Sequence, residues 1–280
     1  MTTDQVSALS TAQFAALKTR QIAALTTDVV SAFSTDQIVA LTTEQARALT
    51  TSQMLALSTA QIAAFETTDL ASLRNTAFAV ISTDQAAALS TAQINALTTR
   101  QVASFATTAL ASLSTDQIIA LSTAQAASLS ASQMGALTTA QITAFETSDL
   151  AALNTAAIAA MSTDQSNSLS TSQVAALTTN QINALPTSVV AALTTSQLIA
   201  LSTSQVAAFT TGQITALSTS QIASLETAEI AALSTTNIGI ISTDQLAALT
   251  TSQVAVFKTS QIAALTTAQI AALSTDQIVA

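Results

Sequence analysis

The stretch Leu265-Thr266-Thr267-Ala268-Gln269-Ile270-Ala271-Ala272 is one copy of an octad in which the whole chain is written. The 280 residues divide into 35 such octads, from Met1 to Ala280, without insertion or deletion. Counting Leu as position 1, the consensus is Leu, Ser/Thr, Thr, variable, Gln, Ile/Val, variable, Ala. Tandem repeats with a short fixed period predict a solenoid, because each unit must bury its apolar face against its neighbours.

Each octad carries a signal for the start of a helix. Position 2 is Ser or Thr in 26 of the 35 octads, and position 5 is Gln in 26. A hydroxyl followed three residues later by Gln is a capping box, in which each side chain binds the backbone N–H of the other residue. Leu at position 1 and Ile at position 6 stand where a hydrophobic staple places its two contacts. We therefore predict a two-turn helix over positions 3 to 8 of each octad.

Thr at position 3 leaves two interpretations open. It occurs in 33 of the 35 octads, more uniformly than the hydroxyl at position 2. Either it is the true cap in some octads, or it bonds to a neighbouring octad.

Two other folds compete with an array of short helices. A single long helix fails, since eight residues turn about 800° and the apolar stripe drifts by roughly 80° per octad. In a β-solenoid, positions 1 and 6 point to opposite faces, whereas in a helix position 6 and the next position 1 share a face. We therefore predict an all-α solenoid, a right- or left-handed superhelix of very short helices, with a β-solenoid as the alternative.

Deviations from the octad are themselves periodic. Gln at position 5 is lost every forty residues, and position 6 becomes small or polar at the same spacing. This favours five octads per superhelical turn, although duplication of a block also explains it. A longer period of eighty residues is superimposed on the forty-residue period. The replacements at position 5 are Val29, Asp69, Ala109, Asp149, Val189 and Glu229, and those at position 6 are Ala46, Ala86, Ala126 and Ser166.

Residues 1–280 are expected to form a single uninterrupted repeat array. The first octad, beginning at Met1, is already in frame, and neither end has the polar capping repeat that solenoids usually carry. We expect a fragment of a longer array, and we see no signal peptide within it.

Composition argues against several classes of partner. No apolar run approaches the 18 or so residues that span a bilayer, so no membrane insertion is expected. The net charge is −9, with only six Lys and Arg scattered along the chain, so nucleic acid is not an expected partner. Cysteine is absent, which excludes disulfides.

Catalysis is not expected, because the sequence lacks His, Cys, Tyr and Trp. Its many hydroxyls have no imidazole to activate them, and helix capping accounts for them. No zinc or haem ligands and no glycine-rich phosphate loop occur, so no cofactor is expected. The sequence therefore argues against an enzyme.

Paired acids are the sharpest candidates for a site. They recur every eighty residues and form a candidate acidic column that offers oxygen atoms to Ca²⁺, although that ion takes six to eight ligands. The simpler interpretation is that the acids replace the Ser/Gln box and complement the helix dipole. We therefore expect no metal site. The pairs are Glu66 with Asp69, Glu146 with Asp149, and Glu226 with Glu229.

The run Leu265–Leu273 resembles octad arrays of very large repetitive secreted or surface proteins of proteobacteria, which are adhesin-like or RTX-type. The resemblance covers the whole chain and implies an extracellular or cell-surface location, but the calcium-binding nonapeptides of RTX proteins are absent. It implies a structural spacer or display scaffold. Two alternatives are a solenoid that binds a protein or glycan and a filament that self-associates end to end.

Overall fold

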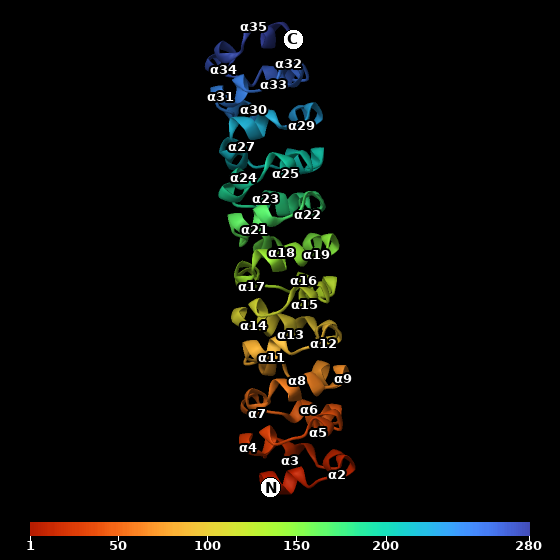
Figure 1. Cartoon of the computed structure of the whole chain (residues 1–280). Helices are drawn as coiled ribbons and strands as arrows, with labels where there is room; N and C mark the ends of the chain where they lie inside the picture. Colours follow the sequence, from red (N-terminus) through yellow and green to blue (C-terminus); the bar gives the residue numbers. More distant parts are fainter. The chain divides into compact units, whose positions relative to one another are not determined.

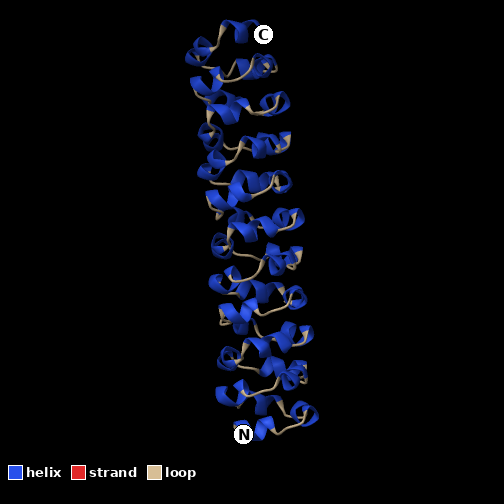
Figure 2. Cartoon of the chain, in the orientation of Figure 1, coloured by secondary structure: helices blue, strands red, loops and turns tan.

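The computed structural model describes residues 1–280 and forms two compact units, Met1–Phe145 and Glu146–Ala280. Both units consist of short helices joined by tight loops, and neither contains a strand (Figure 2). The predicted all-α array of one helix per octad is confirmed, and the β-solenoid alternative is wrong. The helices number 35, and in each unit they wind in successive turns (Figure 1).

The helices of the first unit start at intervals of eight residues. They are α1 (Thr3–Ser7), α2 (Thr11–Ala15), α3 (Thr19–Ala23), α4 (Thr27–Ser31), α5 (Thr35–Val39), α6 (Thr43–Ala48), α7 (Thr51–Ala56), α8 (Thr59–Ala64), α9 (Thr67–Ser72), α10 (Asn75–Phe78), α11 (Thr83–Ala87), α12 (Thr91–Ala96), α13 (Thr99–Ser104), α14 (Thr107–Ala111), α15 (Thr115–Ile119), α16 (Thr123–Ala127), α17 (Ala131–Ala136) and α18 (Thr139–Ala144).

The second unit keeps the same interval. Its helices are α19 (Thr147–Ala152), α20 (Thr155–Ala159), α21 (Thr163–Ser168), α22 (Thr171–Ala176), α23 (Thr179–Ala184), α24 (Thr187–Ala192), α25 (Thr195–Ile199), α26 (Thr203–Ala207), α27 (Thr211–Ala216), α28 (Thr219–Ala223), α29 (Thr227–Ala232), α30 (Thr235–Ile240), α31 (Thr243–Ala247), α32 (Thr251–Ala255), α33 (Thr259–Ile262), α34 (Thr267–Ala272) and α35 (Thr275–Val279).

The capping box sets the start of a typical helix, as in α13. The Thr98 hydroxyl accepts from the Gln101 N–H at 3.2 Å, and the Gln101 side-chain oxygen accepts from the Thr98 N–H at 2.8 Å. Position 2 is thus the cap, and Thr at position 3 is the first helical residue, so it is not an alternative cap. The helix ends at Phe105, whose backbone leaves the helical region at φ −55° and ψ 134°.

The apolar core consists of positions 1 and 6, as the staple predicts. In α13 Val102 at position 6 is fully buried, and Phe105 at position 1 of the next octad is 4% exposed. Aromatic side chains fill the same positions, with Phe14 and Phe33 packed edge to face at 4.8 Å between ring centres. Because each helix is only four to six residues long, its stability must come from this packing rather than from the helix itself.

Glutamine at position 5 links successive turns of each unit. The amide nitrogen of Gln101 donates to the backbone carbonyls of Leu70 and Leu73, both at 2.9 Å, which lie 31 and 28 residues earlier. These carbonyls belong to the last turn and the C-cap of α9, where a helix pairs few of its own carbonyls; that of Leu70 accepts one further bond, from the Leu73 N–H at 3.1 Å. One side chain therefore caps the start of its own helix and the end of a helix in the preceding turn.

The turn is shorter than the sequence suggests. Helix α9 packs against α6 and α12, each three octads away, while Gln101 bonds to Leu70, which lies four octads earlier. The hydroxyl of Ser72 adds a bond to the carbonyl of Thr43, 29 residues earlier. One turn therefore takes about 28 residues, or three and a half octads. The predicted five octads per turn is wrong, and the forty-residue pattern does not mark the turn.

The helices are all far too short to cross a membrane.

Replacing Gln101 with alanine should lower the free energy of unfolding by about 2–3 kcal/mol. The buried Leu73 carbonyl loses its side-chain donor, the Leu70 carbonyl keeps only its bond from the Leu73 N–H, and the capping box is lost as well. The matched control is Gln13→Ala. Gln13 forms the same capping box but is exposed, so its loss should cost about 1 kcal/mol or less. Urea unfolding followed by circular dichroism measures both, and equal losses would contradict the role of the amide nitrogen.

Candidate functional site

The three acidic pairs occupy equivalent places at the starts of α9, α19 and α29. The first acid of each pair is the exposed N-cap residue, and the second lies three residues later at position 5. Asp69, Asp149 and Glu229 are each only 3% exposed. The second acid therefore stands where the array normally holds a buried glutamine.

Of the three buried acids, Glu229 has the hydrogen bonding that most closely resembles that of the glutamine at position 5. Its Oε2 accepts from the N–H of Glu226 at 2.8 Å, as the glutamine oxygen does in other octads. The second carboxyl oxygen then takes the place of the amide nitrogen, which in α13 donates to the carbonyls 28 and 31 residues earlier. For Glu229 those carbonyls belong to Leu201 and Leu198. Burial raises the pKa of Glu229, the bond from Glu226 N–H lowers it, and the Glu226 charge raises it again.

Asp69 fits the same place less well. One of its carboxyl oxygens, Oδ2, is buried without a hydrogen-bond partner. Asn237, which has a side chain of the same length at position 5, donates to the carbonyl of Phe209 at 3.0 Å, 28 residues earlier. The equivalent carbonyl for Asp69 is that of Leu41, which an ionised carboxylate repels. Burial raises the pKa of Asp69 to about 6, and the charge of Glu66 adds to the shift.

Successive acidic pairs do not lie in neighbouring turns. They are ten octads apart, whereas helices that pack directly against each other are three octads apart. In the second unit, α19 packs against α22, and α29 packs against α26 and α32. Nowhere does the chain bring three His, Cys, Asp or Glu side chains together around one point. The cap-box interpretation of the acids holds for α29, whereas Glu66 in α9 and Glu146 in α19 make no side-chain cap bond.

The repeat has a known family. The sequence pattern of the family described as the ALTTAQ repeat matches this chain over most of its length. The chain belongs to the ALTTAQ repeat family. The matches cover residues 1–27, 22–59, 30–67, 62–99, 142–179, 182–219, 190–227, 222–259 and 254–280.

The family match supports a protein built as a structural repeat module. Comparison with curated proteins gives no match, and comparison with solved structures gives none. The adhesin-like or RTX-type character that the octad suggests is therefore a separate proposal.

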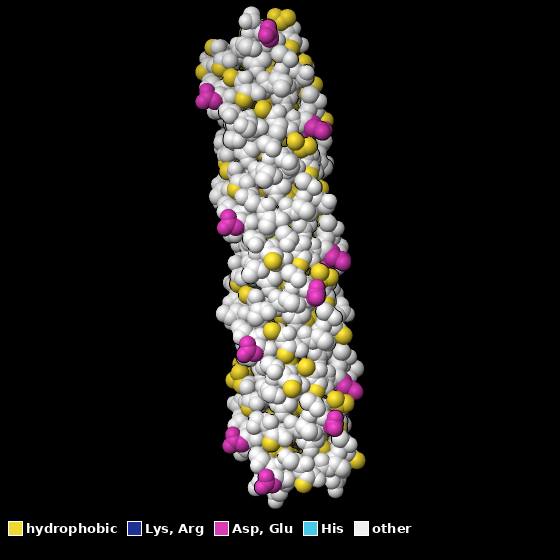
Figure 3. Space-filling model, viewed as in Figure 1, with side chains coloured by type: hydrophobic (Ala, Val, Ile, Leu, Met, Phe, Trp, Pro, Cys, Tyr) yellow, Lys and Arg dark blue, Asp and Glu magenta, His cyan; other side chains and the backbone are white.

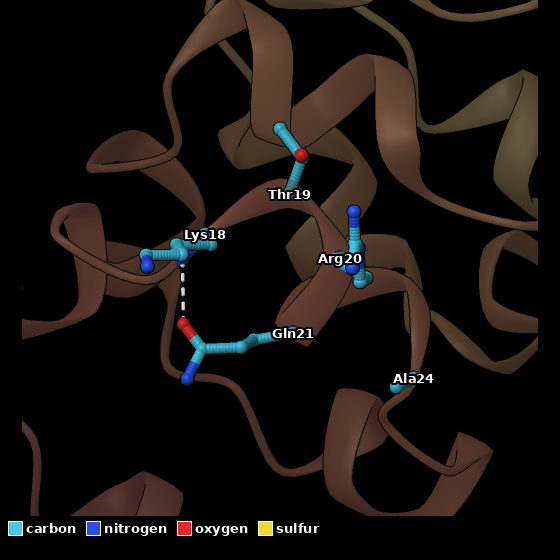
Figure 4. A pocket seen from close by; sticks show the side chains of 5 residues that line it. All are labelled: Lys18, Thr19, Arg20, Gln21 and Ala24. Carbon is cyan, nitrogen blue, oxygen red and sulfur yellow. Dashed lines mark hydrogen bonds between the residues drawn. The ribbon is translucent and has the colours of Figure 1, made fainter.

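Two surface hollows in the first unit of this ALTTAQ array are lined by basic residues, which the sequence pattern did not mark as a site. Lys18, Thr19, Arg20, Gln21 and Ala24 line a hollow of about 600 Å³ (Figure 4). There the Lys18 N–H donates to the side-chain oxygen of Gln21 at 2.8 Å. The second hollow, of about 460 Å³, is lined by residues of α6, α9 and the start of α10. They are Arg47, Ala71, Ser72, Leu73, Arg74 and Asn75.

Changing Asp69 to asparagine should stabilise the chain at pH 7 by about 1–2 kcal/mol, because the new amide donates to the Leu41 carbonyl in place of a buried charge. The pKa of Asp69 is raised in the folded state. Its stabilising effect is therefore full below the unfolded value of 3.8 and is lost as the pH rises through about 6.

Thermal melting of both proteins between pH 4 and pH 8 tests this expectation. The advantage of Asp69→Asn should grow as the pH rises from 4 through about 6 and level off at higher pH. Glu66→Gln, which removes only the lesser cause of the shift, is the matched control and should give a smaller effect in the same direction. A constant difference at every pH would refute the assignment to Asp69.

Proposed function

We propose that this chain is a spacer or display scaffold within a large bacterial extracellular protein. The observation that carries the proposal is the range of its contacts: each octad bonds and packs only with octads a turn away. Gln101 reaches back to Leu70, and Gln213 makes the equivalent bond to Ile182 at 2.8 Å. Because no contact depends on the total number of octads, length can change without redesign of any interface.

The extracellular setting rests on the resemblance of the octad to arrays in secreted and surface proteins of proteobacteria. The low content of charged residues, 8% of the whole chain, agrees with a passive scaffold.

The proposal also assigns the chain no catalytic role. Its most regular hydroxyls are occupied by structure: Ser58 and Thr98, for example, accept hydrogen bonds from the N–H groups of Gln61 and Gln101. A hydroxyl engaged in this way has no neighbouring base, because the sequence has no His and only two Lys.

Insertion of a second copy of residues 161–240 after residue 240 tests the spacer function. Eighty residues keep the octad in frame and add just under three turns, so the maximum dimension from solution scattering should grow by about 25–30 Å if stacked turns lie about 9–10 Å apart. The helix content per residue should stay constant by circular dichroism.

The matched control inserts the same eighty residues in scrambled order. It should lower the helix content per residue and broaden the scattering profile. A repeat insertion that leaves the maximum dimension unchanged would show that added octads do not extend the array, and the spacer function would be abandoned.

A further inference from the structure

Most of the basic residues lie in the first unit, at intervals of about one turn. Arg20, Arg47, Arg74 and Arg100 follow one another at nearly equal spacing, a little under one turn, and Lys18 precedes the first. Direct contacts between turns join residues 25 to 31 apart, as in the bonds from Asn95 to Ala120 and from Gln93 to Ile62. Residues that are scattered in the sequence therefore stack in the fold. We call Lys18, Arg20, Arg47, Arg74 and Arg100 the basic column.

Contacts between helices support the stacking at each step. Helix α3, which carries Arg20, packs against α6, which carries Arg47. Arg47 and Arg74 line one hollow, as described above. Arg74 is the N-cap of α10, and α10 packs against α13, the helix that carries Arg100. All five basic side chains are exposed.

The acids of the first unit lie mainly elsewhere around the axis. Asp28 and Asp84 are about two turns apart, and Asp4 and Asp116 are about four turns apart. Arg100 lies midway between Asp84 and Asp116 in the sequence, a little more than half a turn from each. Figure 3 agrees, since the drawn face of this unit shows acidic side chains and no Lys or Arg.

None of the five basic residues is neutralised by an ion pair. Glu44 is the nearest acid in the sequence, one helical turn before Arg47 on α6, and it does not pair with it. The column therefore keeps its positive charge, and guanidinium groups are well suited to bind carboxylates and sulfates with two parallel hydrogen bonds.

We propose that the basic column binds a linear acidic polysaccharide that carries an anionic group on every second sugar. Stacked turns place successive arginines about 9–10 Å apart along the unit. A sugar ring spans about half that distance, so the anions of such a chain match the arginines one for one. The hollow at Arg47 and Arg74 accommodates a sugar between two successive contacts.

The same spacing disfavours nucleic acid. Duplex DNA carries one charge per about 1.7 Å of its axis, so most of its phosphates find no partner on this column. The chain as a whole has a net charge of −9, which repels a dense polyanion at long range. A sparsely charged chain follows the column and stays clear of most of the acids, Glu44 beside Arg47 being the exception.

Binding of a fluorescent hyaluronan octasaccharide, which has one carboxylate per disaccharide, tests the proposal by anisotropy with the full chain in low-salt buffer. Arg47→Gln with Arg74→Gln should weaken binding about tenfold, since exposed charge pairs contribute up to about fivefold each. A tetrasaccharide should bind more weakly than the octasaccharide, because it spans fewer arginines. Added salt should weaken all binding.

Lys258→Gln is the matched control, because it removes the one basic residue outside the column. Its affinity should equal that of the unchanged chain, and circular dichroism should show that all variants stay folded. The proposal is overturned if the octasaccharide does not bind or binds no better than neutral dextran. It is also overturned if Lys258→Gln weakens binding as much as the double variant, or if single-stranded DNA of equal length binds more tightly.

Discussion

The structure depends on one side chain that is hydrogen-bonded at both ends of its amide. The oxygen of the glutamine at position 5 accepts from the N-cap of its own helix, and its nitrogen donates to the open end of a helix one turn earlier. A helix of six residues has more unpaired backbone groups at its ends than paired groups inside, and burying them unpaired is costly. The shared glutamine satisfies groups at a start and at an end at once, which makes helices of this length compatible with a buried core.

This two-sided hydrogen bonding also explains which positions of the octad accept substitutions and which do not. The positions between the core residues vary freely, because most of them point outward and few bond to another turn. Position 5 varies only to residues that fit the same slot. Val29 and Val189 are buried there without polar atoms, whereas Asn237 keeps the donor. Glu229 has the shape of glutamine and Asp69 that of the shorter asparagine, but both replace a donor with an acceptor, so they are the places where the array's stability becomes sensitive to pH.

Local features could be predicted from the sequence, and the relation between turns could not. The capping box and the apolar positions 1 and 6 act within about eight residues, so their outcome at Thr98, Gln101 and Val102 follows from neighbouring residues alone. The number of octads per turn depends on the bend at each loop and on where the glutamine nitrogen finds carbonyls. Nothing in one octad encodes that distance.

The forty-residue pattern at Val29 and Asp69 suggested a turn because it was regular, but regularity in a sequence can have a genetic origin. The acidic pairs lie at helix starts, as the sequence suggested, because that placement also depends only on neighbouring residues.

A turn of about three and a half octads has a further consequence for surface chemistry. Since the turn is not a whole number of octads, a residue never stacks on the same octad position of the next turn. Arg20 is at position 4, Arg47 at position 7, Arg74 at position 2 and Arg100 again at position 4. Aligning the octads places these residues in different columns and makes them look unrelated, whereas the fold brings them to one face. A surface feature of this array must therefore change octad position at each turn. It can be found only by counting along the chain in steps of one turn, the separation that the glutamine bonds join, rather than in steps of one octad.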